Sequence, residues 1–426
     1  MSLLEFFEPT ILTIKLLVRF WWLWLAPSLF VIFRGLWLVW RQQLYMSSIS
    51  WVSLELKMPR EIEKSPKAME QVLAALYPLR NSPGDIMDTY QAGEVTLWWS
   101  LEIFSFGGDI HFLMRIPEKH KRIIVSNLYA NYPMIEVEEV PDYLDRLPQT
   151  FEGLRKTGQD IWGGEVVLKK EDAYPIRTYL QFENLEESMA VDPIAGLMET
   201  LSRLDRHENL FFQIVIRPAD DAWKKKGEML IKQLKIEGQK TIVGPLGEFT
   251  DRPIRTPGET ETLKAIEESL SKPGYETLIR YVYMTHKDRM SGEAKDFARR
   301  SIMTALNQYM SQDLNSFERN PKVTTDVKWT YYPWVFVSMR LEARKARIWS
   351  ALRMRRIPEH HVGHKLLNLS PLHANVGQRT SILNTEELAT LFHPPTHIVL
   401  TGPLIKRVEA KKMGPSVGLE MFEDKE

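Results

Sequence analysis

The sequence WVSLELKMPREIEKSPKAMEQVLAALY, residues 51–77, combines two hydrophobic periods. Over residues 51–58, apolar side chains occupy every second position, which predicts a strand with one buried face. After Ser65 and Pro66, which suit an N-cap and a first helical turn, apolar residues recur at the three- and four-residue spacing of an amphipathic helix. These helical apolar residues are Met69, Val72, Leu73, Leu76 and Tyr77. The stretch therefore predicts a strand followed by a helix.

The sequence beyond residue 77 completes a pattern of six elements. The further elements are predicted as strands at residues 95–104 and 109–116, a helix at 118–132 and a strand at 135–140. Gly107-Gly108 is a hairpin signal between the two strands, and Pro133 ends the helix. The order strand, helix, strand, strand, helix, strand is that of the ferredoxin-like split βαβ fold. We therefore predict a ferredoxin-like domain over residues 50–143.

A second unit follows a less regular stretch, residues 144–173, which we interpret as a connector. Residues 174–328 are predicted to contain strands at 176–182, 210–217, 276–286 and 317–319, and helices at 192–204, 222–234, 262–270 and 293–310. Pro- and Gly-rich residues 244–258 are interpreted as an inserted loop. The predicted class is α+β, with two ferredoxin-like domains, the second one elaborated. Residues 329–426 are expected to be a loop-rich basic tail with one short helix at 385–391.

Residues 20–40, FWWLWLAPSLFVIFRGLWLVW, contain a single charged residue, Arg34. At about 1.5 Å per residue, this stretch as a helix would be roughly 30 Å long, enough to cross a bilayer. Tryptophans gather at its two ends, where aromatic rings favour the headgroup level. They are Trp21, Trp22, Trp24, Trp37 and Trp40. A buried core helix fits less well, because core helices rarely carry five tryptophans sorted to their two ends. A cleaved signal peptide fits worse, because the apolar run continues where a cleavage site would lie. Residues 1–46 are therefore predicted to be a retained membrane anchor.

The path of this anchor has two alternatives. Pro27 removes one helical hydrogen bond, so a re-entrant hairpin with residues 10–25 stays open beside a single span. Arg34 lies near one end, where its side chain can reach the interface. Basic residues lie on both sides of the apolar run, so the sequence leaves the orientation in the membrane open.

Composition argues against several classes of function. Lys plus Arg and Asp plus Glu number 55 each, so no net charge attracts nucleic acid. The chain has no cysteine, which excludes disulfides, a thiol nucleophile and a thiolate metal site. It contains no GxxxxGK[ST], GxGxxG, HExxH or GxSxG motif. We therefore expect a protein that is not an enzyme, with no catalytic, cofactor-binding or metal-binding residues.

Two segments near the end carry chemistry that could still matter. The histidines of PEHHVGH, residues 358–364, lack a supporting carboxylate pattern and are interpreted as a solvated loop. Residues 344–356, RKARIWSALRMRR, are densely basic, and a solvated helix face is the favoured interpretation. The alternatives are contact with nucleic acid, anionic lipid or an acidic partner. The candidate contact residues are Arg344, Arg347, Trp349, Arg353, Arg355 and Arg356.

Three stretches resemble a known family: residues 54–77, residues 107–143 (GGDIHFLMRIPEKHKRIIVSNLYANYPMIEVEEVPDY) and residues 381–395 (SILNTEELATLFHPP). The chain resembles the membrane-anchored, non-ATPase region of unknown function that accompanies conjugation-type, type IV secretion ATPases in candidate-phylum bacteria. This resemblance implies a separate P-loop ATPase as partner, reached by residues 344–395. The candidate docking residues are Asn384, Glu386, Glu387 and Leu388.

The resulting hypothesis is a non-catalytic scaffold in the bacterial inner membrane, with a cytoplasmic body that docks the ATPase and could self-associate. The main alternative is a membrane-associated nucleic-acid-binding protein that uses the basic segment. A third is an unrecognised hydrolase, which would need a deep pocket with convergent polar groups, expected between the two domains.

Overall fold

The computed structural model describes residues 15, 19–58, 64–183, 191–237, 239–243, 249–253, 256–327, 334–358 and 377–396. The chain divides into two units. The first unit comprises Met1–Ile49, Asn81–Thr96 and Glu359–Ala374, and the second comprises Ser50–Arg80, Leu97–Pro358 and Asn375–Glu426.

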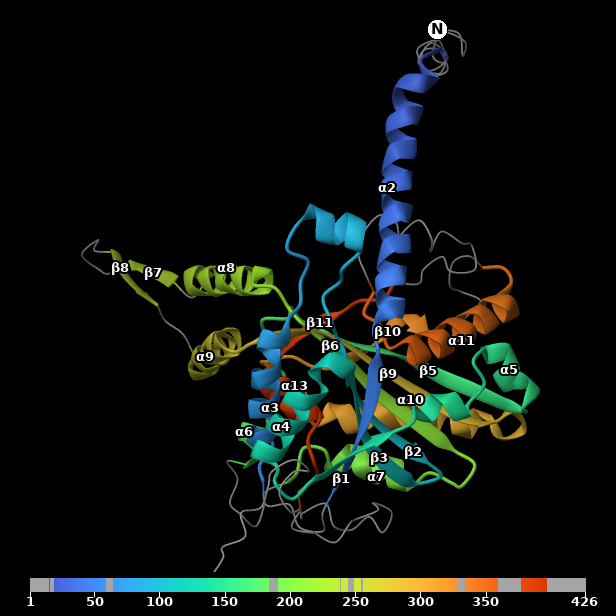
Figure 1. Ribbon diagram of the computed structural model, residues 1–426. Helices are drawn as coiled ribbons and strands as arrows, with labels where there is room; N and C mark the ends of the chain where they lie inside the picture. Colours follow the sequence, from blue (N-terminus) through green and yellow to red (C-terminus); the bar gives the residue numbers. More distant parts are fainter. Residues whose placement is uncertain are drawn as a thin grey trace, which may run out of the picture. The chain divides into compact units, whose positions relative to one another are not determined.

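A nine-stranded antiparallel sheet forms the centre of the second unit (Figure 1). Eight strands lie in the order β10-β5-β9-β6-β2-β3-β1-β4, and β11 pairs with the start of β9. The strands are β1 Trp51–Lys57, β2 Trp99–Phe106, β3 Asp109–Pro117, β4 Glu136–Val140, β5 Gln159–Leu168, β6 Asn209–Pro218, β9 Gly274–His286, β10 Phe317–Thr324 and β11 Ser381–Asn384.

Helices alternate with these strands along the chain, so the predicted α+β class is confirmed. They are α3 Lys67–Leu76, α4 Lys121–Asn131, α5 Phe151–Lys156, α6 Tyr179–Glu183, α7 Ala195–Ser202, α8 Ala222–Glu237, α9 Pro257–Ser271, α10 Gly292–Asn307, α11 Val337–Met354 and α13 Thr385–Leu391. Short 3₁₀ turns follow α3 (η1 Tyr77–Leu79), precede α4 (η3 Glu118–His120), precede α5 (η4 Tyr143–Arg146) and precede α10 (η6 Lys287–Arg289).

The two halves of the sheet share one strand order. The strands β1 to β4 are arranged as β4-β1-β3-β2, and β5, β6, β9 and β10 are arranged as β10-β5-β9-β6. The halves meet where β2 pairs with β6, from Trp99↔Ile216 to Phe106↔Asn209. The strands predicted in the two regions therefore belong to one continuous sheet.

Helices cover both faces of this sheet. One hydrophobic core lies against α3, α4, α7, α10 and α13, and the other lies against α5 and α11. Adjacent residues of β2 divide between them, with Ile103 in the first core and Phe104 in the second. Because both faces are buried, the central strands are apolar along their length instead of alternating.

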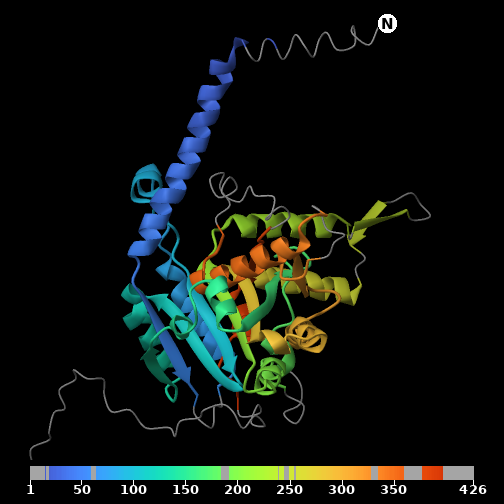
Figure 2. The same cartoon turned by 90° about the vertical axis from the view of Figure 1, so that its right-hand side faces the viewer.

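An insertion between β6 and β9 projects from the sheet. It runs through α8, a hairpin of β7 Gln239–Val243 and β8 Phe249–Pro253, and then α9. Figures 1 and 2 show the hairpin at the far end of α8, away from the sheet. The prediction of an inserted loop over residues 244–258 is therefore wrong at 249–253, which form β8, and at 257–258, which begin α9.

The connector predicted over residues 144–173 contains a central strand. This strand, β5, pairs with both β9 and β10. Its sequence QDIWGGEVVL is buried on both faces, so it lacks the alternation by which a half-buried strand is recognised. Gly163 is needed there because a Cβ would lie 2.5 Å from the Tyr281 carbonyl oxygen.

The strand predicted at residues 176–182 is absent from the described structure, where α6 begins at Tyr179 instead. The backbone N–H of Ile176 donates to Glu387 Oε1 at 2.9 Å, and that of Tyr179 donates to Thr390 Oγ1 at 3.0 Å. Side chains of α13 therefore take the hydrogen bonds that a neighbouring strand would otherwise provide.

The described part of the tail contains more regular structure than the sequence analysis expects. Residues 337–354 form α11, and residues 381–391 form β11 and α13. The short helix predicted at 385–391 is confirmed as α13. Its N-cap, Asn384, forms a reciprocal capping box with Glu387.

Candidate functional site

The helix α2, Trp21–Ser48, belongs to the first unit and continues without interruption through Pro27. It is long and apolar enough to cross a membrane, with a mean hydropathy of 1.6 in its most apolar window. Trp21 and Trp22 are 55% and 57% exposed, and Trp37 and Trp40 are 40% and 49% exposed. The side chain of Trp24 is not among those that the structure describes. Of residues 10–25, the partner segment of the alternative hairpin, the structure describes only Lys15 and residues 19–25.

The second half of α2 packs against another part of its own unit, residues 81–96, which contain the short helix η2 Asp88–Ala92. Trp37 Nε1 donates to the Tyr90 carbonyl oxygen at 2.9 Å, and the Arg34 guanidinium lies 5.8 Å from the centre of the Tyr90 ring. At Gly93, with φ +73°, a Cβ would lie 2.5 Å from the Arg41 carbonyl. The contacts with residues 81–96 thus begin at Arg34, and the large apolar side chains from Leu29 to Phe33 are exposed.

The predicted contact residues of the basic segment lie on α11 and at its end, and several are buried. Arg344, Trp349 and Arg355 are buried, so the interpretation of a solvated face is wrong for them. Arg347, Arg353 and Arg356 are half-buried. Charge density alone indicated exposure, whereas the tertiary structure provides each buried cation with acceptors.

The acceptors come from the sheet and its connections. Arg344 Nη1 donates to the Thr324 carbonyl oxygen at 3.2 Å, and Trp349 Nε1 donates to the Pro148 carbonyl oxygen at 3.0 Å. Arg353 donates to the carbonyl oxygens of Leu144 and Leu147. These contacts fix α11 to the second face of the sheet, which leaves these side chains engaged within the chain.

Arg355 is ion-paired with two carboxylates. Its Nε lies 2.5 Å from Glu102 Oε1, and its Nη1 lies 2.5 Å from Asp142 Oδ2. Burial lowers the pKa of Arg355, but the two carboxylates outweigh it and hold that pKa well above its ordinary value. Burial raises the pKa of Asp142, but the Arg355 hydrogen bond brings it below its usual value.

A row of polar side chains crosses the centre of the sheet beneath the end of α11. The row follows strand pairing, with Glu102 opposite Gln213, Gln213 opposite Arg280, and Arg280 opposite Glu165. All four side chains are buried. Gln213 Nε2 and Arg280 Nη1 donate to the last carbonyl oxygens of α11, Leu352 at 3.0 Å and Ala351 at 2.8 Å. The row therefore binds the C-terminal end of α11.

The sequence analysis missed this row, although each member gives a local signal. Each lies alone in an apolar run: Glu102 in SLEIF, Gln213 in FFQIVI, Arg280 in LIRYV and Glu165 in GEVVL. A single polar residue inside a doubly buried strand requires a buried partner. The partners themselves could not be inferred, because they lie far apart in the sequence.

The predicted docking residues Asn384, Glu386, Glu387 and Leu388 are also buried, which corrects their assignment as a docking surface. Glu386 is paired with Lys272, whose Nζ lies 2.9 Å from Glu70 Oε1. Nearby, His393 Nε2 lies 2.8 Å from Asp192 Oδ1, and both are buried. These contacts tie the segment from β11 to residue 396 to helices of the first sheet face.

Glu387 is a buried acid held by two backbone donors. Its carboxyl accepts hydrogen bonds from the backbone N–H of Asn384 at 2.8 Å and of Ile176 at 2.9 Å. Burial raises the pKa of Glu387 to about 8, despite these two donors. Glu387 is therefore largely neutral at pH 7.

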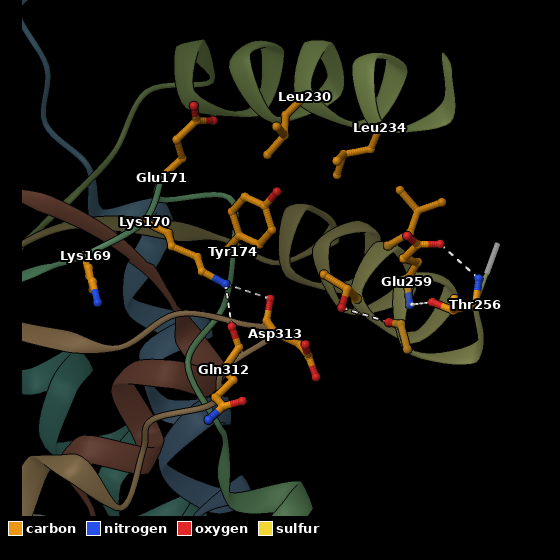
Figure 3. A pocket seen from close by; sticks show the side chains of 13 residues that line it. Lys169, Lys170, Glu171, Tyr174, Leu230, Leu234, Thr256, Glu259, Gln312 and Asp313 are labelled. Carbon is orange, nitrogen blue, oxygen red and sulfur yellow. Dashed lines mark hydrogen bonds between the residues drawn. The ribbon is translucent and has the colours of Figure 1, made fainter. Parts of the chain in front are cut away.

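A cavity of about 710 Å³ lies within the second unit, beside the insertion (Figure 3). Leu230 and Leu234 of α8 point into it, and Tyr174 faces them from the loop after β5. Lys170 Nζ donates to the carbonyl oxygens of Gln312 at 2.8 Å and Asp313 at 3.0 Å. Its walls come from α8, α9 and the loops after β5 and before β10, whereas the hydrolase alternative expects a pocket between the two domains.

Residues 359–364, which include these histidines, lie outside the described residues. Within the described part of the chain, no group of three or more His, Cys, Asp or Glu side chains could hold a metal ion.

We predict that replacing Arg355 by Gly destabilises the protein by about 3–5 kcal/mol, because it leaves the buried Glu102 carboxylate without its cation. The half-buried Asp142 also loses the nearer of its two arginines, since Arg115 lies 3.8 Å away. Arg355 has φ 50°, which favours Gly, so relief of backbone strain acts in the opposite direction. Chemical denaturation measures the change, with Arg356→Gly as the control. Unchanged or increased stability of Arg355→Gly would contradict the structural role of the ion pairs.

We also predict that Glu387 makes stability depend on pH. Its pKa rises from an ordinary value of 4.5 to about 8 on folding, so its contribution is complete below pH 4.5 and is lost as the pH rises through about 8. Urea denaturation between pH 5 and 8 should show a falling free energy of unfolding, and Glu387→Gln should reduce that slope, leaving the part due to Asp172, whose pKa burial also raises. Glu268→Gln, on the exposed side of α9, is the control. Parallel curves for Glu387→Gln and the unmodified chain would contradict this pKa.

Comparison with known proteins adds a family but no activity. No curated protein matches the chain. The family model described as a domain of unknown function, DUF8128, matches residues 41–328. The match begins within α2 and runs past β10, so it includes both four-strand halves of the sheet. Since it covers more than half of the sequence, the chain belongs to the DUF8128 family.

Proposed function

We propose that the protein is a membrane-anchored, non-catalytic scaffold whose second unit presents a rigid sheet-based body to a partner. The observation that carries this proposal is α2, whose apolar side chains before Arg34 are exposed, with Trp21, Trp22, Phe30 and Phe33 each more than half exposed. A soluble protein seldom leaves such a row uncovered. A lipid bilayer provides the environment that these side chains lack in the chain itself.

The body is best explained as two ferredoxin-like units fused edge to edge. Each half has the order fourth, first, third, second strand, and helices follow its first and third strands. The edges formed by β2 and β6 satisfy each other, so β4 and β10 are the outer edges. This fusion would give one rigid body, because the strands at the junction are buried on both faces.

The outer edges are poorly suited to adding a strand from another protein. β4, EVEEV, carries three glutamates, and β10 contains Pro321 and a break in register between Arg319 and Thr324. Charges, proline and bulges all discourage strand addition. We therefore propose that partners dock through side-chain surfaces of the helices and the insertion.

The partner we propose is a P-loop ATPase of the conjugation or type IV secretion class, at the inner face of a bacterial cytoplasmic membrane. Its support is the sequence resemblance of residues 54–77, 107–143 and 381–395. The nucleic-acid alternative loses support because Arg344, Trp349 and Arg355 are buried. Because Asn384, Glu386, Glu387 and Leu388 are buried as well, we place any ATPase-docking surface outside these residues.

We predict that deleting residues 1–33 releases the protein from membranes, because it removes the exposed apolar part of α2 and retains the part packed on residues 81–96. Carbonate extraction followed by immunoblotting measures the distribution between membrane and supernatant. A deletion of residues 1–14, which ends before α2, is the control and should stay in the membrane. Retention of the longer deletion in the membrane would contradict the anchor.

We further predict that the full-length protein, extracted from native membranes in mild detergent, co-purifies with a P-loop ATPase. Quantitative mass spectrometry against an untagged strain measures the enrichment. A matched sample uses Arg355→Gly, whose perturbed fold should reduce the recovery of a partner that needs the rigid body. Enrichment of nucleic acid without any ATPase would contradict the proposed partner and leave the membrane anchor untouched.

A further inference from the structure

The outward face of α8 has a composition that its packing does not explain. The helix contacts the rest of the insertion through its inner face, where Trp223 and Gly227 are buried and Leu230 and Leu234 are half-buried. A Cβ at Gly227 would lie 2.5 Å from the Leu270 side chain of α9, so the two helices approach closely. On the opposite face, Lys225, Met229, Lys232 and Ile236 are exposed.

Two large apolar side chains lie on this outward face. Met229 and Ile236 are 61% and 66% exposed, and their spacing of seven residues places both on one side of the helix. The helix already has a hydrophobic inner face, formed by Trp223, Leu230 and Leu234, and Met229 and Ile236 do not belong to it. The outward pair therefore needs a separate explanation.

Lysines surround this apolar pair. Lys225 and Lys232 lie beside Met229 and Ile236 on the exposed face, and Lys226 borders them on the other side. None of these three lysines lies within ion-pair distance of a described carboxylate, although Lys226 interacts electrostatically with Asp172, whereas Lys224 is paired with Asp221 and Lys235 with Glu267. Glu228 is also exposed on this helix, so the face is net cationic around an apolar centre.

This arrangement matches the chemistry of an anionic lipid surface. Apolar side chains can enter the boundary between headgroups and acyl chains, while the lysine ammonium groups contact lipid phosphates. Nucleic acid would use the lysines but would gain little from Met229 and Ile236, which have no ring to stack on a base. Charge complementarity together with the apolar centre therefore favours lipid.

We propose that the outward face of α8, formed by Lys225, Lys226, Met229, Lys232 and Ile236, lies on the surface of an anionic bilayer. This inference rests on the proposed membrane anchor and extends it to a second lipid contact, made by the second unit. Two separate contacts would restrict how the body can turn above the membrane. The insertion would then set the orientation in which the body meets its partner.

The test uses the full-length chain in nanodiscs of phosphatidylcholine, with or without phosphatidylglycerol. Because the chain has no cysteine, Gln233→Cys on the outward face carries a single environment-sensitive fluorophore. We expect a blue shift of its emission only with phosphatidylglycerol, and loss of the shift at high salt. A label at Ser126→Cys, exposed on α4, is the control and should not respond.

Charge reversal separates a specific face from general attraction. Lys225→Glu, Lys226→Glu and Lys232→Glu together should abolish the blue shift. The same change of charge at three exposed lysines elsewhere, Lys119, Lys287 and Lys295, should leave it intact. Equal loss in both triple variants, or a label that responds to an added protein or nucleic acid and never to lipid, would overturn the proposal.

The outcome is distinguishable from failure of the anchor itself. Stable incorporation of the chain into nanodiscs reports on α2, and the fluorophore reports on α8. Incorporation without any lipid-dependent shift would overturn the role of α8 while the anchor stands. Failure to incorporate would overturn both.

Discussion

The position of α11 depends on the ion pairs that the buried Arg355 makes with the carboxylates of Glu102 and Asp142. Arg355 ends the helix at φ 50°, a conformation that costs a non-glycine residue about 1–3 kcal/mol and persists only where its surroundings fix it. Those surroundings are the two carboxylates and the stacked ring of Tyr143. Without this arrangement, the second face of the sheet would lose its cover, including Ile348, Trp349 and Leu352.

The same constraint explains why charges occur in the middle of the sheet. Glu102, Gln213, Arg280 and Glu165 would each be unfavourable alone in a doubly buried strand. Paired in a row, they provide donors for two carbonyl oxygens at the end of α11. One is that of Leu352, in the last turn, where a helix leaves carbonyl groups without partners, and the other is that of Ala351, which also accepts from the Arg355 backbone N–H. The polar row and Arg355 therefore act on the same helix end and hold it in one register over the sheet.

Local pattern predicted much of this fold and little of its chemistry. The alternation in β1, the amphipathic spacing in α3 and the Gly107-Gly108 turn, where both glycines have positive φ, all report on neighbours close in sequence. β5 escaped prediction because burial on both faces removes alternation. The basic run ending at Arg356 was misread because sequence shows a charge without its partner: Lys345 and Asp160 form an ion pair 2.7 Å long across 185 positions.

This distinction between charges with and without partners also indicates where the molecule can interact. Around α11, cations that look available in the sequence are buried or bonded to sheet carboxylates and carbonyl oxygens. On α8, Lys225, Lys226 and Lys232 look in the sequence like an ordinary solvated run, and in the structure they are indeed exposed. They differ from such a run because Met229 and Ile236 are exposed beside them. Solvation alone accounts for the lysines, but it gives no reason for two large apolar side chains between them. The insertion, outside the repeated strand order of the two halves, is therefore one part of the body in which cationic and apolar side chains are exposed together on one helix face.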